Sequence, residues 1–164
     1  MLRSNETDRF LSAAAWAAMN IRYCWLATTD GAGAMNVRPM GRLPRDIDED
    51  EWIVRFVTHG RSRKVEEIRR AGRVAIIFQK DVEEAYLTLT GMATVRSGAI
   101  EDRRHWRDAY SVYFPREEDR KSAAFVEIRI DRMEMWIRGV TPEPFGLRPA
   151  TLERNGADSW RTIA

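Results

Sequence analysis

The sequence predicts a mainly β protein: an antiparallel barrel of six or seven strands with short α-helices at its flanks. Short apolar runs of strand length follow one another along most of the chain, and turn residues separate them. Only brief stretches of helical periodicity interrupt these runs. Strands that are neighbours in sequence pair most simply as antiparallel neighbours, so this order favours a closed antiparallel barrel over a doubly wound parallel sheet.

The N-terminal half predicts a helix, a hairpin, a third strand and a second helix. The stretch from Asn5 to Met19 places its apolar residues on one side and has candidate N-caps at Ser4 and Asn5. Two strands at 23–28 and 35–43 are joined by an Asp-Gly-Ala-Gly turn, which indicates a hairpin. The chain then continues with an acidic loop at 44–50, a strand at 52–58 and a short helix that ends at Gly72.

The C-terminal half predicts four more strands around a helical insertion. In the second of these strands, Gly91 indicates a bend or bulge. Aromatic residues at helical spacing predict a helix over 100–114, which Pro115 stops. The last two strands are expected to turn at Asp131-Arg132. The four strands are predicted at 73–79, 86–95, 124–130 and 133–137.

Composition indicates one domain over residues 1–164, with 140–164 as a tail that packs on the barrel or on a partner subunit. The 27 Lys and Arg residues nearly balance 25 Asp and Glu residues, and a net charge of +2 gives no general attraction to nucleic acid or anionic lipid. One cysteine and two histidines are too few for a structural zinc site. The N-terminus lacks the order of a secretory signal, and the longest apolar run is about half of a membrane span, so we expect a cytoplasmic protein.

The start of the second helix concentrates positive charge. Arg61, Arg63 and Lys64 surround its predicted N-cap, Ser62. Cations at a helix N-terminus are unfavourable by about 0.3–1 kcal/mol each, and the acidic pair Glu66-Glu67 comes too late to neutralise the first turn. A phosphate on the free backbone N–H groups, with the Ser62 hydroxyl and the cations around it, would remove this conflict. The alternative is that the long cationic side chains turn into water.

Three sequence features resemble the FMN-binding split barrels of the pyridoxamine 5'-phosphate oxidase superfamily. They are Asn36-Val37-Arg38-Pro39-Met40 after an Asp-Gly turn, the Thr58-x-x-x-Ser62-x-Lys64 turn, and the stretch from Tyr86 to Gly91 that leads to Phe114-Pro115 and Glu134-Met135-Trp136. The match covers residues 10–136 and is closest to the general-stress-protein branch. It implies a split-barrel fold with FMN as the cofactor.

The resemblance also implies a set of FMN-binding residues. In the family, an arginine of the second strand, here Arg38, holds the flavin phosphate together with Ser62, Arg63 and Lys64. The other implied residues are Val37, Pro39 and Met40 beside the isoalloxazine edge, Val57 and Thr58 near the ribityl chain and phosphate, and Trp136 at the subunit boundary. Without the resemblance, Arg38 would be interpreted as a strand arginine paired with an acidic neighbour, and His59 in the turn as a solvated side chain or a donor to the ligand.

Two departures from the family pattern limit what the resemblance implies. After Trp136 the chain reads Ile137-Arg138-Gly139-Val140, without the pyridoxal-phosphate-binding segment of true pyridoxamine phosphate oxidases. A family glutamine that faces the flavin corresponds to Tyr86. The family arrangement implies a homodimer with FMN between the two subunits.

Two classes of function stay open from the sequence. In the first, the protein is an FMN-dependent oxidoreductase that acts on a small molecule, with NAD(P)H as the electron donor. No catalytic residue is identified, because the flavin ring itself carries the redox step. In the second, the protein binds flavin, a deazaflavin or haem without turnover in a stress response. A single-stranded nucleic-acid contact is disfavoured by the near-neutral charge.

Overall fold

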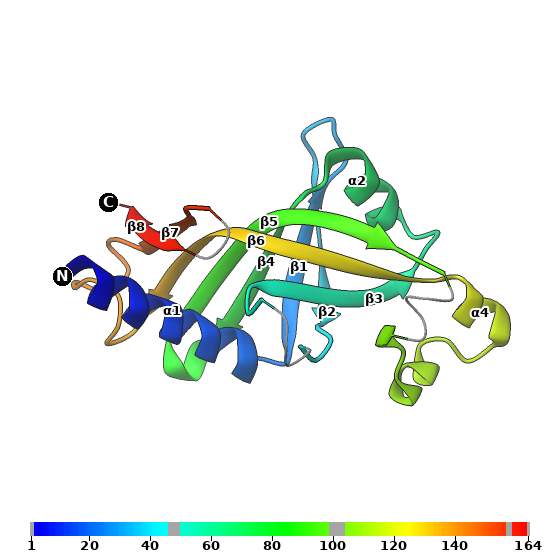
Figure 1. Ribbon diagram of the computed structural model, residues 1–164, viewed down its shortest axis with the longest axis horizontal. Helices are drawn as coiled ribbons and strands as arrows, with labels where there is room; N and C mark the ends of the chain where they lie inside the picture. The colour runs from blue at the N-terminus through cyan, green and yellow to red at the C-terminus, as the bar shows by residue number, and fades with distance from the viewer. Residues whose placement is uncertain (1, 46–49, 99–103, 157–158, 164) are drawn as a thin grey trace.

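The computed structural model describes residues 2–45, 50–98, 104–156 and 159–163. Its strands form one antiparallel sheet in the order β2-β1-β4-β5-β6-β7-β8, and β3 pairs with β6 outside this path (Figure 1). The strands are β1 (Tyr23–Thr29), β2 (Met35–Gly41), β3 (Ile53–His59), β4 (Arg73–Lys80), β5 (Ala85–Arg96), β6 (Ala123–Ile137), β7 (Ala150–Arg154) and β8 (Trp160–Ile163). The helices are α1 (Leu2–Asn20), α2 (Arg63–Ala71) and α4 (Glu117–Lys121), with the 3-10 turns η1 (Asp81–Glu83) and η2 (Asp108–Val112).

The prediction of a mainly β antiparallel fold with short helices is confirmed. The sheet has eight strands instead of six or seven, because the C-terminal tail, for which no strand was predicted, forms β7 and β8. β7 pairs with the second half of β6, and β8 pairs with β7. Trp160 of β8 packs edge-on against Trp52 with ring centroids 5.7 Å apart, and Thr162 contacts Thr7 of α1. The tail therefore extends the sheet beside the N-terminal helix.

A β-bulge interrupts the pairing of the two longest strands, β5 and β6. The register shifts between Thr90 and Gly91, so Asp131 is an extra residue on β6. The predicted turn at Asp131-Arg132 is wrong, since β6 continues through it without a break. The Asp131 carboxylate accepts hydrogen bonds of 2.5 and 2.7 Å from Arg73 of β4. Asp131 is a residue type that is common in turns, but here it forms a partly exposed ion pair with Arg73 beside the bulge.

The core lies between the inner face of the sheet and α1, which crosses one end of the sheet (Figure 1). The predicted apolar side of this helix is confirmed, because Phe10, Ala14 and Ala17 are buried. Cys24 of β1 is also buried, and burial raises the pKa of its thiol to about 12. No helix in the described part of the chain combines the length and the apolar character that a membrane span requires. Successive strands β1, β4, β5 and β6 contribute fully buried Leu26, Ile76, Leu89 and Met133 in register.

The start of α1 and the helical insertion differ from the predictions. α1 begins at Leu2, so Ser4 and Asn5 lie inside the helix and not at its N-cap position. The preference of such residues for the cap position is only about 1 kcal/mol, which a continuing helix can outweigh. The predicted acidic loop at 44–50 falls largely on 46–49, which lie outside the described residues.

No continuous helix forms over the described part of 100–114. Residues 108–112 form the 3-10 turn η2, and α4 begins only after Pro115. The Trp106 ring lies 5.8 Å from Tyr110 and 5.7 Å from Phe114, so a compact aromatic cluster accounts for the helical spacing of these residues.

Candidate functional site

The turn between β3 and α2 is fixed by a contact within the turn and by contacts with Ser122, the residue before β6. The Ser62 N–H donates to the His59 carbonyl (3.0 Å), and the Gly60 N–H donates to the Ser122 carbonyl (2.7 Å). A Cβ on Gly60 would lie 2.9 Å from that carbonyl oxygen, so only glycine allows this approach. Nδ1 of His59 lies 3.1 Å from the Ser122 hydroxyl, and the His59 ring packs against Phe114. These contacts give the first turn of α2 a defined position.

Ser62 occupies the N-cap position of α2, as predicted, but its hydroxyl makes no capping hydrogen bond. The Ser62 Oγ is buried and has no hydrogen-bond partner among the described residues. The N–H groups of Arg63 and Lys64 open the helix, where no intrahelical acceptor exists for them. Buried polar groups are nearly always paired, so the buried Ser62 hydroxyl beside these helix N–H groups indicates a place for an acceptor that does not belong to this chain.

Lys64 and Arg38 bring two positive charges to the same place. The Lys64 Nζ donates to the Thr58 hydroxyl at 3.0 Å. Burial lowers the pKa of Lys64 below its ordinary value, and the nearby Arg38 charge lowers it further. An anion beside both groups would stabilise their charged forms. We call Ser62, Lys64, Arg38 and the first N–H groups of α2 the anion cradle.

Arg38 is held on β2 by three hydrogen bonds. Its Nη1 donates to the Thr28 hydroxyl (2.5 Å) and to the Leu26 carbonyl (3.3 Å), and its Nη2 lies 3.4 Å from a Glu67 carboxylate oxygen. A guanidinium has five N–H donors. Nε–H and one N–H of Nη2 have no acceptor in the part of the chain that the structure describes, so Arg38 keeps two donors for a ligand.

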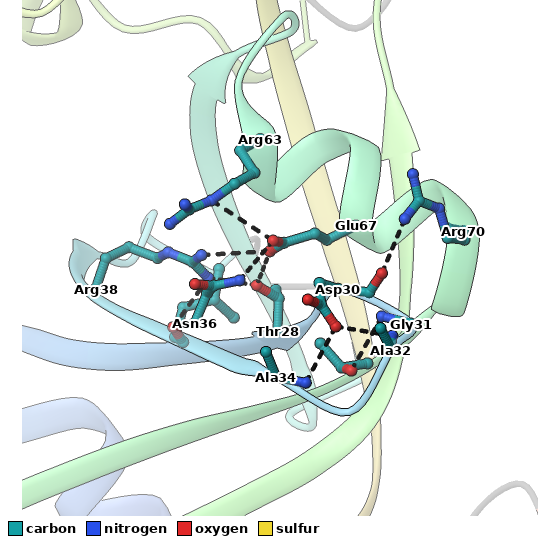
Figure 2. Close-up of polar contacts among 12 residues, drawn as sticks. Thr28, Asp30, Gly31, Ala32, Ala34, Asn36, Arg38, Arg63, Glu67 and Arg70 are labelled. Atoms are coloured by element: carbon teal, nitrogen blue, oxygen red, sulfur yellow. Dashed lines mark hydrogen bonds and ion pairs between the residues drawn. The ribbon is translucent and has the colours of Figure 1, made fainter.

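Glu67 joins α2 to the β1–β2 hairpin (Figure 2). Its side chain is only 4% exposed and accepts hydrogen bonds from Thr28 (2.5 Å) and Asn36 (2.7 Å). Nε of Arg63 lies 3.5 Å from the Glu67 carboxylate oxygen that Thr28 does not contact. The Thr28 hydrogen bond chiefly lowers the pKa of Glu67, against the effect of burial, and the charges of Arg38 and Arg63 lower it further.

The prediction that Glu66-Glu67 cannot neutralise the first turn of α2 is wrong for Glu67. An α-helix places residues i and i+4 on one side, so Glu67 reaches Arg63, and the fold brings Arg38 to it as well. The alternative interpretation of Arg38 as a strand arginine with an acidic partner is thus correct in part. In the described residues, however, no carboxylate contacts the Ser62 hydroxyl or the Lys64 amine.

The other predicted cofactor-binding residues lie in three places. Thr58 is buried beside Lys64, and Val57 precedes it on β3. Val37 and Pro39 are exposed on the outer face of β2, and Met40 is partly buried. Trp136 pairs with Tyr86 at the far end of β6.

The structure does not bring Trp136 to the cradle within one chain. Ala124 of β6 pairs with Thr58, and Trp136 follows 12 residues later on the same strand. At about 3.3 Å per residue, that separation is on the order of 40 Å of extended strand.

Sequence reasoning did not identify Thr28, Asn36 and Glu67 as part of the site. The i,i+4 spacing of Arg63 and Glu67 was the one local signal for Glu67. Thr28 and Asn36 are partners in the hairpin register, but their contact with α2 depends on how the helix packs against the hairpin.

Comparison with known proteins shows that most of the chain matches the model of one protein family. The family model described as pyridoxamine 5'-phosphate oxidase like matches residues 15–142. The comparison with curated proteins gives no match. A solved structure from Clostridium acetobutylicum, of a protein related to general stress protein 26, has a TM-score of 0.69 at 18% identity and covers 90% of this chain and 95% of its own.

Two further structures share the fold. An FMN-binding protein from Nostoc punctiforme, related to pyridoxamine 5'-phosphate oxidase, has a TM-score of 0.69 at 16% identity, with 96% of each chain covered. A heme binding protein from Mycobacterium smegmatis has a TM-score of 0.60 at 15% identity and covers 86% of this chain and 56% of its own. At these identities the similarity establishes the fold, which is the predicted split barrel.

Proposed function

Since the chain belongs to the pyridoxamine 5'-phosphate oxidase-like family, we propose that it binds FMN and acts as an FMN-dependent oxidoreductase on a small molecule. The observation that carries this proposal is the buried Ser62 hydroxyl, unpaired among the described residues, at the N-terminus of α2. Lys64 and Arg38 stand beside it with their positive charges. Hydroxyl, ammonium, guanidinium and helix N–H groups together suit a dianionic phosphate monoester.

When bound, FMN supplies the redox chemistry through its ring, and the protein's part is to hold and orient it. Ser62, Lys64 and Arg38 would hold the phosphate, and Arg63 would add charge from an exposed position. Val57 and Thr58 on β3 would contact the ribityl chain, since Thr58 lies beside Lys64, and Val37, Pro39 and Met40 on β2 would line the ring edge.

The substrate is proposed not to be pyridoxamine 5'-phosphate. The segment after Trp136 offers one cation, Arg138, and its guanidinium is engaged by Glu84 through two hydrogen bonds of 2.5 and 2.7 Å. Arg138 also stacks over the Phe145 ring at 4.2 Å. Arg138 therefore has partners within its own chain and is a poor candidate for a second phosphate.

Reduction of the bound flavin separates turnover from binding alone. Purified protein is expected to be yellow and to release FMN, not FAD, on heating. Mixing with NADH or NADPH in a stopped-flow spectrometer is expected to bleach the flavin within seconds, and a substrate is expected to restore its colour. A yellow protein whose flavin is not reduced within minutes would contradict the oxidoreductase and leave the non-catalytic flavin carrier. Protein that binds neither FMN nor any other flavin would contradict both.

We further propose a homodimer with the cofactor between its subunits. The outer face of the β1–β2 hairpin exposes Trp25 (46%) and Val37 (54%), with Tyr23 and Met35 on the same face. Exposed apolar patches of this kind are typical of protein interfaces. A second subunit would also supply the Trp136 that one chain cannot bring to its own cradle.

Replacing Trp25 by glutamate is expected to convert the dimer into a monomer, because the charge would have to be buried without a partner. Sedimentation velocity measures the change from twice 19.0 kDa to 19.0 kDa. The matched control is Val82→Glu, since Val82 is 93% exposed on η1 and its replacement should leave the mass unchanged. Wild-type protein that sediments at 19.0 kDa would rule out the dimer.

A further inference from the structure

We propose that the buried Thr28–Glu67 pair positions Arg38 for the ligand phosphate and does not block the anion cradle. This inference rests on the proposed binding of FMN. A carboxylate among cations can have either of two roles. It can occupy the place of the ligand anion and compete with it, or it can hold the cations in the geometry that the ligand needs.

The partners of Glu67 favour the positioning role. Two of them, Thr28 on β1 and Asn36 on β2, are neutral donors that need not move when a ligand binds. Glu67 is 4% exposed, so its carboxylate is covered by the helix and the hairpin. Among the described residues its carboxylate contacts neither Ser62 nor Lys64, so its oxygens have a place separate from the cradle.

Thr28 connects Glu67 to Arg38. Its hydroxyl donates to the Glu67 carboxylate and accepts from Nη1 of Arg38, each at 2.5 Å. Thr28 is 1% exposed, so water cannot easily replace either bond. Together with the Leu26 carbonyl, these contacts fix the Nη1 and Nη2 end of the guanidinium. The Nε–H has no acceptor in the described residues.

A second contact holds α2 independently of Thr28. Nη1 of Arg70 donates to the Asp30 carbonyl at 2.8 Å, in the turn of the hairpin (Figure 2). A change at Thr28 therefore removes the shortest of the three hydrogen bonds that hold Arg38, while the helix stays attached to the hairpin.

The variant Thr28→Val tests the proposal without changing any charge. We expect its Kd for FMN to rise at least fivefold, because Arg38 loses its orientation. The Kd for riboflavin, which has no phosphate, should stay within twofold of wild type. Thr28→Ser keeps the hydroxyl and should restore FMN binding. Titrating the apoprotein with flavin and recording the quenching of flavin fluorescence measures each of these affinities.

The variant Glu67→Gln tests the carboxylate itself. Both oxygens of Glu67 face donors, so an amide nitrogen at either position would oppose one of them. We expect at least a tenfold rise in the Kd for FMN, whereas Glu66→Gln, which removes the same charge from an exposed neighbour, should leave it unchanged. In an Arg38→Ala background, Glu67→Gln should change the Kd less than twofold, because Glu67 acts through Arg38.

The outcomes separate this inference from the proposed function. Wild-type protein that does not bind FMN overturns both. Wild-type binding of FMN with an equal affinity in Thr28→Val overturns the inference alone. Tighter FMN binding by Glu67→Gln would identify Glu67 as a competitor of the phosphate and would also overturn the inference. An equal loss of riboflavin and FMN affinity in Thr28→Val would overturn the inference as well. Circular dichroism reports folding, and should Glu67→Gln fail to fold, the Thr28 variants decide the question.

Discussion

The double variant Ser62→Ala/Lys64→Ala is expected to lose copurified FMN while the fold survives. Charge-assisted hydrogen bonds contribute roughly 1.5–3 kcal/mol each, so losing two raises the Kd by roughly two to four orders of magnitude. The folded chain itself loses little. The Ser62 hydroxyl has no hydrogen-bond partner among the described residues, and the one bond described for the Lys64 side chain goes to Thr58. Removal of Lys64 also relieves its repulsion with Arg38.

Flavin content per chain, from the absorbance spectrum of the purified protein, measures the loss, and circular dichroism confirms the fold. Arg69→Ala is the matched control, because it removes one positive charge from an exposed position at the other end of α2. The control should keep its flavin. Stoichiometric FMN in the double variant would show that the phosphate binds elsewhere.

The variant Gly91→Ala is expected to be destabilised by about 3 kcal/mol, since overpacking against a rigid neighbour costs this much. A Cβ at Gly91 would lie 2.1 Å from the backbone oxygen of Arg129 and 2.7 Å from its carbonyl carbon. A flexible side chain could move away from such a contact, but the backbone of β6 cannot without breaking the bulge. In a chain of this length the midpoint of thermal unfolding should fall by roughly 6–12 °C.

The control for this prediction is Gly41→Ala at the end of β2. The nearest atom to a Cβ at Gly41 is in the Tyr23 ring at 3.7 Å, which is an ordinary contact. Its free energy of unfolding should change by less than about 0.5 kcal/mol. Equal melting temperatures for the two variants, measured by circular dichroism, would mean that the bulge adapts to a side chain.

The residue pattern within short stretches of sequence predicted most of the strands and turns that build the sheet. The β1–β2 hairpin, the short helix ended by Gly72 and the irregularity at Gly91 each depend on residues that are close in sequence. The predictions failed where a long-range contact determined the structure. Asp131 has the composition of a turn residue, but the register with β5 makes it a bulge. The strands of the tail form because β6 offers an edge for β7.

The sequence by itself determined that positive charge and a serine gather at the start of α2, because these residues are neighbours in the chain. It could not determine that Glu67 lies with them. That carboxylate is positioned by Thr28 and Asn36, which are 39 and 31 residues away, and by the packing of α2 on the hairpin. Only the tertiary structure decided which cations are already paired and which polar groups stay available, because burial and hydrogen bonding between distant segments follow from the fold.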